Sequence, residues 1–181
     1  KTLYCQINLF FDFLAIYEIY RYIKKNKISI VHTHSSKAGI LGRWAARFAG
    51  VPIIIHTIHG WEFHQQQNFF SHLLYVSLER ITAKITTKLV AVSQYDIHTG
   101  LKKRICSQDK YLLIRYGIKK EDFSNPQIDI RAKREELAFE PGSLTVGMVA
   151  CFKPQKSPLD FIKVARLVTK ILPQVKFILV G

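Results

Sequence analysis

The sequence predicts an α/β fold in which parallel sheets are flanked by helices. Short runs rich in Val, Ile and Leu alternate along the 181 residues with longer runs whose apolar residues recur every three or four positions. Few residues separate one run from the next, and strands that are joined through a helix lie parallel in one sheet. A hydrophobic content of 48% is ordinary for a globular protein with a core.

The alternation begins within residues 17–60. Residues 17–27 are expected to end a helix and enter a basic turn, and "KISIVHTH" (27–34) is expected to form a short buried strand. "SKAGILGRWAARFAG" (36–50) predicts a helix, and "VPIIIHTIHG" (51–60) predicts a second buried strand. The apolar face of this helix carries Ile40, Leu41, Trp44, Ala45 and Phe48, and another face carries Arg43 and Arg47.

Both ends of this helix carry stop and start signals. Ser35 or Ser36 can serve as its N-cap, because a serine hydroxyl accepts a hydrogen bond from a free N–H of the first turn. Gly50 stands where a left-handed residue ends a helix, and Pro52 prevents continuation.

The pattern continues to the end of the chain with one interruption. Residues 68–88 predict a long helix, 88–93 a strand, 94–104 a helix and 110–118 a strand. Residues 119–142 are charged, contain Pro126, Pro141 and Gly142, and predict a connector with a short helix at 130–139. The pattern then restarts with a strand at 143–150, a helix at 157–172 and a strand at 174–181. The predicted organisation is a first domain at 1–118, a connector at 119–142 and the start of a second domain at 143–181.

The helix at 157–172 carries a clear N-terminal signal. Ser157 can cap it, Pro158 takes the first helical position, and Asp160 lies in the first turn, where the helix dipole favours a negative charge. The long helix at 68–88 is open to two interpretations: an amphipathic helix on a membrane surface, or a helix packed on the sheet. We prefer the second, because an α/β fold must cover its sheet.

Composition limits the class of protein. No apolar run reaches roughly 18 residues, so no membrane-spanning helix is expected, and the first residues lack the cleavage site of a signal peptide. The three cysteines are far apart in sequence and suggest neither a zinc site nor a disulfide framework, which favours the reducing cytosol. The net charge of +14 attracts nucleic acid, anionic lipid or an anionic substrate, and charge alone does not decide among them.

Polar residues follow the first strand at the point where ligands bind in α/β folds. Ser35, Ser36 and Lys37 stand at the carboxyl end of a strand and the start of a helix, where free N–H groups and a cation bind an anionic or hydroxyl-rich group. Gly39 permits a close backbone approach. The alternative is a simple helix cap beside a solvated lysine.

Histidines are frequent around the same strands. A metal site is one interpretation of His32, His34, His56, His59 and His64, since imidazole is a common ligand. No cysteine or acidic cluster supports this interpretation. His59 ends the second strand and is a candidate for contact with a substrate, although a satisfied strand-end histidine is an equal alternative.

Several segments together resemble the retaining glycosyltransferases of family 4, which have two Rossmann-like domains of the GT-B type. "VHTHSSKAGILGRWAARFAGVPIIIHTIHG" is similar to their N-terminal acceptor-domain signature, and "LVAVSQYD" to the strand and turn that follow it. "RYGIKKEDF" resembles the family's Asn-Gly-Ile-Asp segment, with Gly117 and Ile118 kept. "VGMVACFKPQKSPLDFIKVA" resembles the first strand, loop and helix of the nucleotide-sugar domain. The resemblance covers the chain from about Ile28 to its end.

The resemblance implies roles for individual residues. His59 matches a histidine near the transferred sugar and is the catalytic candidate; Ser35, Ser36, Lys37 and Gly39 fall on the acceptor side. Lys156 matches a lysine that holds the donor diphosphate, and Gly117, Gly147 and Ser157 fall on the donor side. Cys151 stands where Arg is common, and Tyr116 and Lys119 replace Asn and Asp. The reaction implied needs no metal and no cofactor beyond the nucleotide-sugar substrate.

The resemblance also predicts parts that this sequence lacks. The family's first strand and glycine-rich loop would precede Lys1, and its acidic donor-sugar motif would follow Gly181. Two full domains need on the order of 300 residues. We therefore expect a fragment without transferase activity of its own.

The function expected is transfer of a sugar from a nucleotide-sugar to a hydroxyl acceptor, with retention. The acceptor would be a glycan or lipid-linked glycan in cell-surface polysaccharide synthesis, and the protein cytoplasmic, peripheral at the inner face of an anionic membrane. Alternatives are a basic α/β domain that binds nucleic acid and a non-catalytic fragment that binds a partner. Nucleic acid is not the expected partner, because the aromatic residues fall on apolar faces rather than among exposed Arg and Lys.

Overall fold

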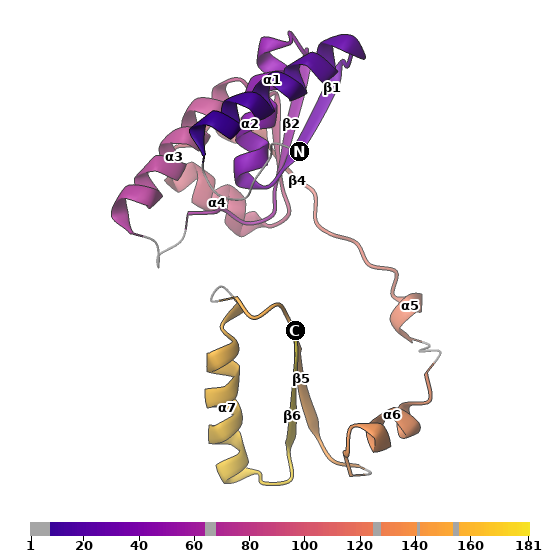
Figure 1. Ribbon diagram of the computed structural model, residues 1–181. Helices are drawn as coiled ribbons and strands as arrows, with labels where there is room; N and C mark the ends of the chain where they lie inside the picture. Colours follow the sequence, from indigo (N-terminus) through magenta and orange to yellow (C-terminus); the bar gives the residue numbers. More distant parts are fainter. Residues whose placement is uncertain (1–7, 64–67, 125–127, 141, 154–155) are drawn as a thin grey trace. The chain divides into compact units, whose positions relative to one another are not determined.

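The computed structural model describes residues 8–63, 68–124, 128–140, 142–153 and 156–181 (Figure 1). The chain divides into two compact units, Lys1–Gly117 and Ile118–Gly181. The first holds a four-stranded sheet and the second a two-stranded sheet, and every strand pair is parallel. The predicted α/β class is therefore confirmed. The division falls one residue before the predicted boundary, and the predicted connector is grouped with the second unit.

In the first unit, helices and strands alternate as expected. The helices are α1 (Leu9–Lys25), α2 (Ser36–Phe48), α3 (Phe69–Lys84) and α4 (Gln94–Lys102), with a short 3₁₀ helix at Gln108–Lys110. The strands are β1 (Ile30–His34), β2 (Ile53–Ile58), β3 (Lys88–Ala91) and β4 (Tyr111–Leu113), and they lie side by side in chain order.

The sequential strand order places the connecting helices on one face of the sheet. Right-handed crossovers between neighbouring parallel strands bring α2, α3 and α4 to the same side. α1 packs on α2, and α2 contacts β1, β2 and α3 (Figure 1). α2 therefore lies between α1 and α3.

The start of the sheet is less buried than predicted. In β1 only Thr33 is buried, whereas Ile30, His32 and His34 are exposed. β1 lies at the edge of the described sheet, and its outward residues point to the face opposite the helices. The expectation of a buried first strand is corrected to that extent. The second strand, β2, is buried over most of its length, as predicted.

The predicted end of α2 is confirmed in detail. Gly50 has a φ of 76°, its N–H donates to Arg47 O over 3.1 Å, and Val51 N–H donates to Ala46 O over 3.0 Å. These bonds form a Schellman motif, which satisfies carbonyls left free in the last turn. At the other end Ser35 is the N-cap residue, but its side chain makes no capping hydrogen bond.

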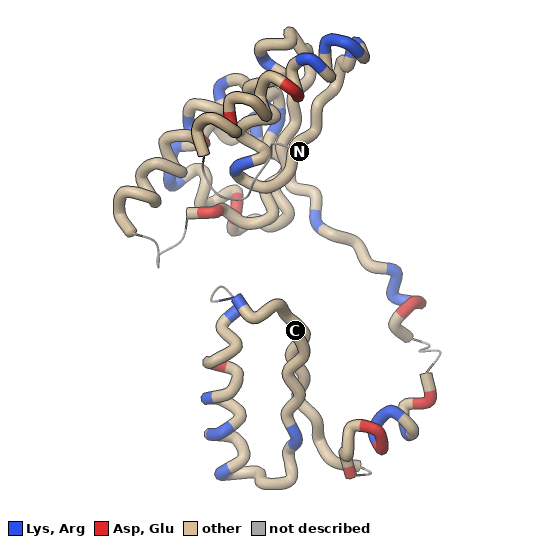
Figure 2. Tube along the Cα trace, in the orientation of Figure 1, with Lys and Arg blue, Asp and Glu red and all other residues tan. Residues whose placement is uncertain are grey.

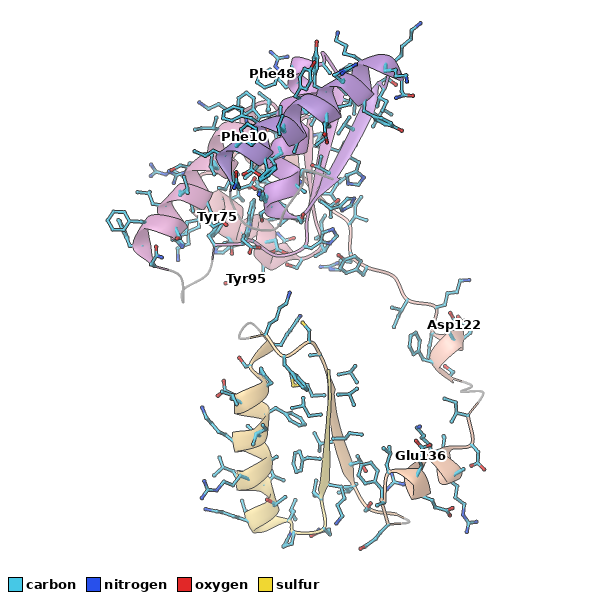
Figure 3. The ribbon with its side chains drawn as sticks, in the orientation of Figure 1. Phe10, Phe48, Tyr75, Tyr95, Asp122 and Glu136 are labelled. Carbon is cyan, nitrogen blue, oxygen red and sulfur yellow. The ribbon has the colours of Figure 1, made fainter. Side chains whose placement is uncertain are left out.

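Two faces of α2 differ from the prediction. Arg43 has no exposed surface, and Phe48, which was assigned to the apolar face, is 60% exposed and projects outward (Figure 3). The buried side of the helix carries Ala45, Ala46 and Ala49, whose small side chains allow close packing against α1 and the sheet. A single amphipathic stripe does not describe a helix that is covered by α1, α3 and the sheet.

Other element boundaries differ from the predicted ones by a few residues. α3 ends at Lys84, short of the predicted 88, because Lys88 begins β3. The strand predicted at 110–118 is regular only over Tyr111–Leu113. α3 is also only partly packed: Val76, Glu79, Thr82 and Ala83 are buried, while Phe69 and Phe70 at its start are 74% and 81% exposed.

The second unit repeats the pattern on a smaller scale. It contains α5 (Glu121–Ser124), α6 (Ile130–Glu136), β5 (Thr145–Val149), α7 (Pro158–Ile171) and β6 (Lys176–Val180). Pro158 and Asp160 occupy the first turn of α7 as predicted. Ser157 is the N-cap residue with a φ of 50°, and it makes no side-chain capping bond, which corrects the expectation that its hydroxyl caps the helix.

Candidate functional site

A polar pocket opens at the carboxyl edge of the first sheet. It has a volume of about 170 Å³ and is lined by residues that follow β1 and β2. Ser35 and Ser36 come from the start of α2, His59 and Gly60 from the end of β2, and Trp61 and Glu62 from the loop beyond. Loops at the carboxyl ends of parallel strands form the binding sites of α/β folds, so this pocket is the candidate site.

Three imidazoles form a stacked row beside the pocket. The ring centroids are 4.4 Å apart for His32 and His34, and 5.1 Å apart for His34 and His59. His34 Nδ1 and His59 Nε2 share a hydrogen bond of 2.8 Å, and His32 Nε2 lies 2.7 Å from Thr57 Oγ1. Burial, followed by the nearby His34 and His59, lowers the pKa of His32. The neutral form of His32 is favoured by these neighbours.

Tyr116 completes the row. Its ring stacks on His59 with a centroid distance of 5.8 Å, and its hydroxyl forms a hydrogen bond with His59 Nδ1. Both ring nitrogens of His59 are thus engaged. To contact a substrate through nitrogen, His59 has to exchange His34 or Tyr116 for the incoming group.

The side chain of His56 forms the floor of the pocket and is buried from solvent. It is 3% exposed, and its Nδ1 lies 2.9 Å from Thr33 Oγ1. Burial, with a further contribution from Arg43, lowers the pKa of His56 to about 3. The imidazole is therefore neutral at physiological pH and acts as a packed, hydrogen-bonded part of the site.

The His56 ring packs so close to residue 39 that only glycine fits there, and Gly39 does not line the pocket. A Cβ at Gly39 would lie 2.5 Å from His56 Cε1 and 2.9 Å from its Nδ1. The close approach predicted for Gly39 is present, but the approaching group is the His56 ring, which leaves no room for a ligand. The prediction of acceptor contact is corrected to a packing role.

A buried ion pair supports this floor from below. Arg43 Nη2 donates to Glu79 Oε2 over 2.8 Å, and Arg43 Nε donates to Gly39 O over 3.0 Å. Both side chains are almost completely buried. Because Glu79 also lines the pocket, the pair connects α2 and α3 directly beneath it.

Lys37 is separated from the two serines. Its ammonium forms an ion pair of 2.6 Å with Asp12 on α1, and its side chain lines a groove between the helices. Ser35 and Ser36 line the polar pocket, and Lys37 does not. Lys37 pairs with α1, which supplies a carboxylate that the sequence pattern did not reveal.

The predicted donor residues lie in or near the second unit. Lys156 is exposed and directly precedes Ser157 at the start of α7, so the predicted order of lysine and helix start is present. Gly147 lies inside β5 opposite Ile178, whose Cγ2 would be 3.3 Å from an added Cβ. Gly117 ends the first unit and has open space around it. Cys151 is exposed and free at the end of β5.

Sequence reasoning missed Trp61, Glu62 and Glu79 as pocket residues. Trp61 donates from Nε1 to Asp96 O over 2.9 Å and stacks on Phe63, so it is a fixed aromatic wall. Its place directly after His59 and Gly60 was a signal that could have identified it. Glu79 lies mid-helix far along the chain, and no local pattern marks it.

Metal binding has no geometric support in the described part of the chain. Within residues 8–63, 68–124, 128–140, 142–153 and 156–181, no three His, Cys, Asp or Glu side chains are grouped to hold an ion. His64, one of the histidines considered for a metal, lies outside the described residues. The same residues contain no helix that is both long and apolar enough to span a bilayer.

Known proteins have sequences similar to that of this chain. The family described as Glycosyltransferase Family 4 matches residues 6–121. An Escherichia coli protein, UDP-Gal:alpha-D-GlcNAc-diphosphoundecaprenol alpha-1,3-galactosyltransferase, is 37% identical over 99% of this chain and 47% of its own length. The capsular polysaccharide biosynthesis glycosyltransferase CapM of Staphylococcus aureus is 24% identical over 97% of this chain and 46% of its own length. The chain thus spans about half the length of the curated relatives it matches.

Solved structures share its fold. The crystal structure of HepE from Anabaena in complex with UDP and glucose matches with a TM-score of 0.71 and 15% identity, over 91% of this chain and 42% of that one. A glycosyltransferase from Rickettsia africae matches with a TM-score of 0.65 and 17% identity, over 99% of this chain and 54% of that one. These matches confirm the predicted GT-B-type fold.

Proposed function

Because this chain belongs to glycosyltransferase family 4, we propose that the protein transfers a sugar from a nucleotide-sugar to a hydroxyl group of a glycan acceptor, with retention of the anomeric configuration. The observation that carries this proposal is the polar pocket at the carboxyl edge of the first sheet, in the family's matched region and walled by His59, Ser35 and Trp61. The reaction class is cell-surface polysaccharide or lipid-linked glycan synthesis, the class named for the E. coli and S. aureus relatives.

The sugar of the acceptor is proposed to bind in the polar pocket. Sugar hydroxyls need both donors and acceptors of hydrogen bonds, and the pocket offers Ser35, Ser36 and the Glu62 carboxylate. An aromatic wall such as Trp61 suits the apolar face of a pyranose. His59 stands at the mouth with two exchangeable partners, so it can accept or donate one hydrogen bond to the reacting groups.

The donor diphosphate is assigned to the start of α7. In the transfer, the bond between the sugar C1 and the diphosphate oxygen breaks while the acceptor oxygen bonds to C1 and gives up its proton to the leaving diphosphate, on which negative charge develops. A cation and free N–H groups at a helix start stabilise that charge where it accumulates. Lys156 supplies the cation and the start of α7 the positive end of a helix dipole, and we propose that neither a metal nor another cofactor takes part.

The place of action is proposed to be the cytoplasmic face of a membrane, where a lipid-linked acceptor is held. The exposed apolar start of α3 supports peripheral contact, because Phe69 and Phe70 are 74% and 81% exposed. A net charge of +14 favours an anionic surface.

A role in nucleic-acid binding is not proposed, because several Lys and Arg of the first unit are engaged within the fold. Lys110 Nζ donates to Ala83 O, Lys84 O and Thr86 O, where it caps the end of α3. Lys88 Nζ donates to Asp109 O, and Arg80 Nε to Lys103 O. Other Lys and Arg lie on both units (Figure 2).

The proposal is tested with the full-length protein, UDP-galactose and GlcNAc linked through a diphosphate to a lipid. We expect galactose transfer and an α-linked product, which proton NMR of the new anomeric signal identifies. A β-linked product would contradict retention, and absence of transfer from every UDP-sugar would contradict the function.

The donor assignment is tested by Lys156→Ala. Loss of one charge-stabilising group typically lowers kcat by roughly a hundredfold or more, and we expect that effect in kcat/KM. Lys163→Ala is the matched control, because Lys163 is an exposed lysine of α7 that pairs with Asp160. Equal activity of the two variants would remove Lys156 from the donor site.

A further inference from the structure

An apolar groove runs between the first three helices of the first unit. Its volume is about 200 Å³, with α2 as the floor and α1 and α3 as the walls. The floor is formed by Ile40 and Leu41, one wall by Leu9, Phe13 and Ile16, and the other by Leu78. Tyr75, labelled in Figure 3, lies on the α3 side. The proposed transfer reaction leaves this groove without a role.

The groove also contains a charged pair. Asp12 and Lys37 line it and form the ion pair of 2.6 Å between α1 and α2. Lys37 is in the first turn of α2, directly after Ser35 and Ser36, which line the polar pocket. The start of α2 therefore contributes residues to both the apolar groove and the polar pocket.

We propose that the groove binds the part of the acceptor's hydrocarbon chain nearest its diphosphate, while the acceptor's sugar occupies the polar pocket and Lys37 faces the diphosphate. This inference rests on the proposed function, since it assumes an acceptor that is a sugar diphosphate on a prenyl chain. It assigns a binding site for the lipid part, which transfer chemistry alone does not require.

The shape of the groove favours a single chain over a bilayer surface. Ile40 and Leu41 are each only 9% exposed and still line the groove, so the floor is recessed below the walls. A flat bilayer meets the exposed ends of helices, such as Phe69 and Phe70, and does not reach such a floor. A flexible chain of methyl and methylene groups can enter it, and burial of that apolar surface supplies affinity.

The charged pair suits the same ligand. A prenyl diphosphate is apolar along its chain and anionic at one end, where a phosphate oxygen can replace Asp12 as the partner of Lys37. Asp12 holds Lys37 at the junction, so the ammonium can turn between Asp12 and an incoming phosphate oxygen without crossing apolar surface.

The test compares two phenylalanines of α1 in the full-length protein. Phe13 lines the groove and is 70% exposed, whereas Phe10 does not line it and is 67% exposed. For Phe13→Ser we expect the ratio of KM for a long-chain acceptor to KM for a short-alkyl analogue to rise about tenfold, because contact with the chain is lost. For Phe10→Ser we expect the ratio to stay within about twofold. Melting temperatures establish that both variants are folded.

Other results overturn the proposal. Equal changes in both variants would indicate contact of the helix with the bilayer, and an unchanged ratio in Phe13→Ser would indicate no chain contact. If the unmodified protein transfers sugar to neither acceptor, the proposed function fails, and the groove is then judged by labelling. A polyprenyl diphosphate with a photoreactive group near the diphosphate should label residues of 9–16, 37–41 and 75–78. Labelling confined to other segments would exclude the groove.

Discussion

His59 forms hydrogen bonds with His34 on one side and Tyr116 on the other. Its role in the reaction can be tested separately from its role in stability. The residue is exposed, so its removal exposes little apolar surface and creates no cavity in the core. For His59→Ala we expect kcat/KM of the full-length protein to fall by roughly tenfold or more, the equivalent of one lost hydrogen bond to the reacting groups. The melting temperature should change little.

Parallel measurement of turnover and thermal unfolding decides this prediction. Tyr116→Phe is the companion variant, since it removes one partner of His59 and keeps the stacked ring. A collapse of the melting temperature in His59→Ala, with full specific activity of the residual folded protein, would make His59 a structural residue.

His56 predicts how stability depends on pH. Burial lowers its pKa to about 3, against an ordinary value of 6.5, so between these values the unfolded chain binds a proton that the folded chain rejects. The free energy of unfolding should therefore fall as pH drops below about 6.5, by at most ~1.4 kcal/mol per pH unit from this residue. In His56→Gln that contribution disappears, and the fall with pH should be shallower.

Urea unfolding at several pH values between 7 and 5 measures this slope. His98→Gln serves as the control, because His98 is exposed and its replacement should leave the slope unchanged. If the His56→Gln protein loses stability with falling pH as steeply as the unmodified protein, the neutral buried state of His56 is wrong.

Gly39 offers a second test of the pocket floor. An alanine there places Cβ against the His56 ring, which Thr33 holds from the other side. We expect Gly39→Ala to destabilise the fold by about 1–3 kcal/mol, the usual effect of overpacking, despite the better helix propensity of alanine. Gly117→Ala, with open space around the added methyl group, should change stability by less than about 0.5 kcal/mol. Chemical denaturation compares the two variants, and equal stabilities would refute the packing role.

The residues of the candidate site differ in how well sequence could identify them. Ser35, Ser36 and His59 follow strands directly, so strand assignment alone brought them to one edge of the sheet. Lys37 was expected with them, but it lies outside the pocket, where it pairs with Asp12, more than twenty residues earlier on α1. Contacts between side chains on different helices leave no periodic signal in sequence.

At the scale of the elements, the Arg43–Glu79 pair connects α2 to α3. Removal of one partner leaves an uncompensated buried charge, so Arg43→Met should lower the free energy of unfolding by about 3–5 kcal/mol. The double variant Arg43→Met, Glu79→Leu should recover part of that loss, because two apolar groups need no partner. A double-mutant cycle by urea denaturation measures the coupling, and additive losses would show that the two helices are not joined by this pair.

The order of the elements was predictable, while their exposure was not. Short apolar runs identified the six strands, and helical periodicity identified the helices except α5, which lies in the predicted connector. Arg43 looked like a surface residue because its charge suggested solvent, and only the packing of α3 places Glu79 beside it. Phe69 and Phe70 looked like core residues, and they are exposed because α3 extends beyond the sheet that it covers.

At the scale of the whole molecule, the two units differ in how much of their apolar surface is buried. The first unit contains two buried clusters, one around Leu89 and Tyr111 and one around Ile54 and Ala46. In the second unit Val175 is the core residue among the described residues, and Leu159, Leu167 and Ile171 of α7 are exposed. A two-stranded sheet with one long helix offers little surface for burial.

We therefore predict that the first unit unfolds cooperatively by itself, and that the 181-residue chain shows no sugar transfer. The donor groups at Lys156 and α7 belong to the second unit, whose apolar helix face lacks a covering layer in the described residues. The chain spans about half the length of the curated relatives, so the full-length protein should both cover this face and transfer sugar. Transfer from UDP-galactose, measured side by side for the 181-residue chain and the full-length protein, tests this. Turnover by the 181-residue chain at the full-length rate would place the complete donor site within residues 1–181 and refute the prediction.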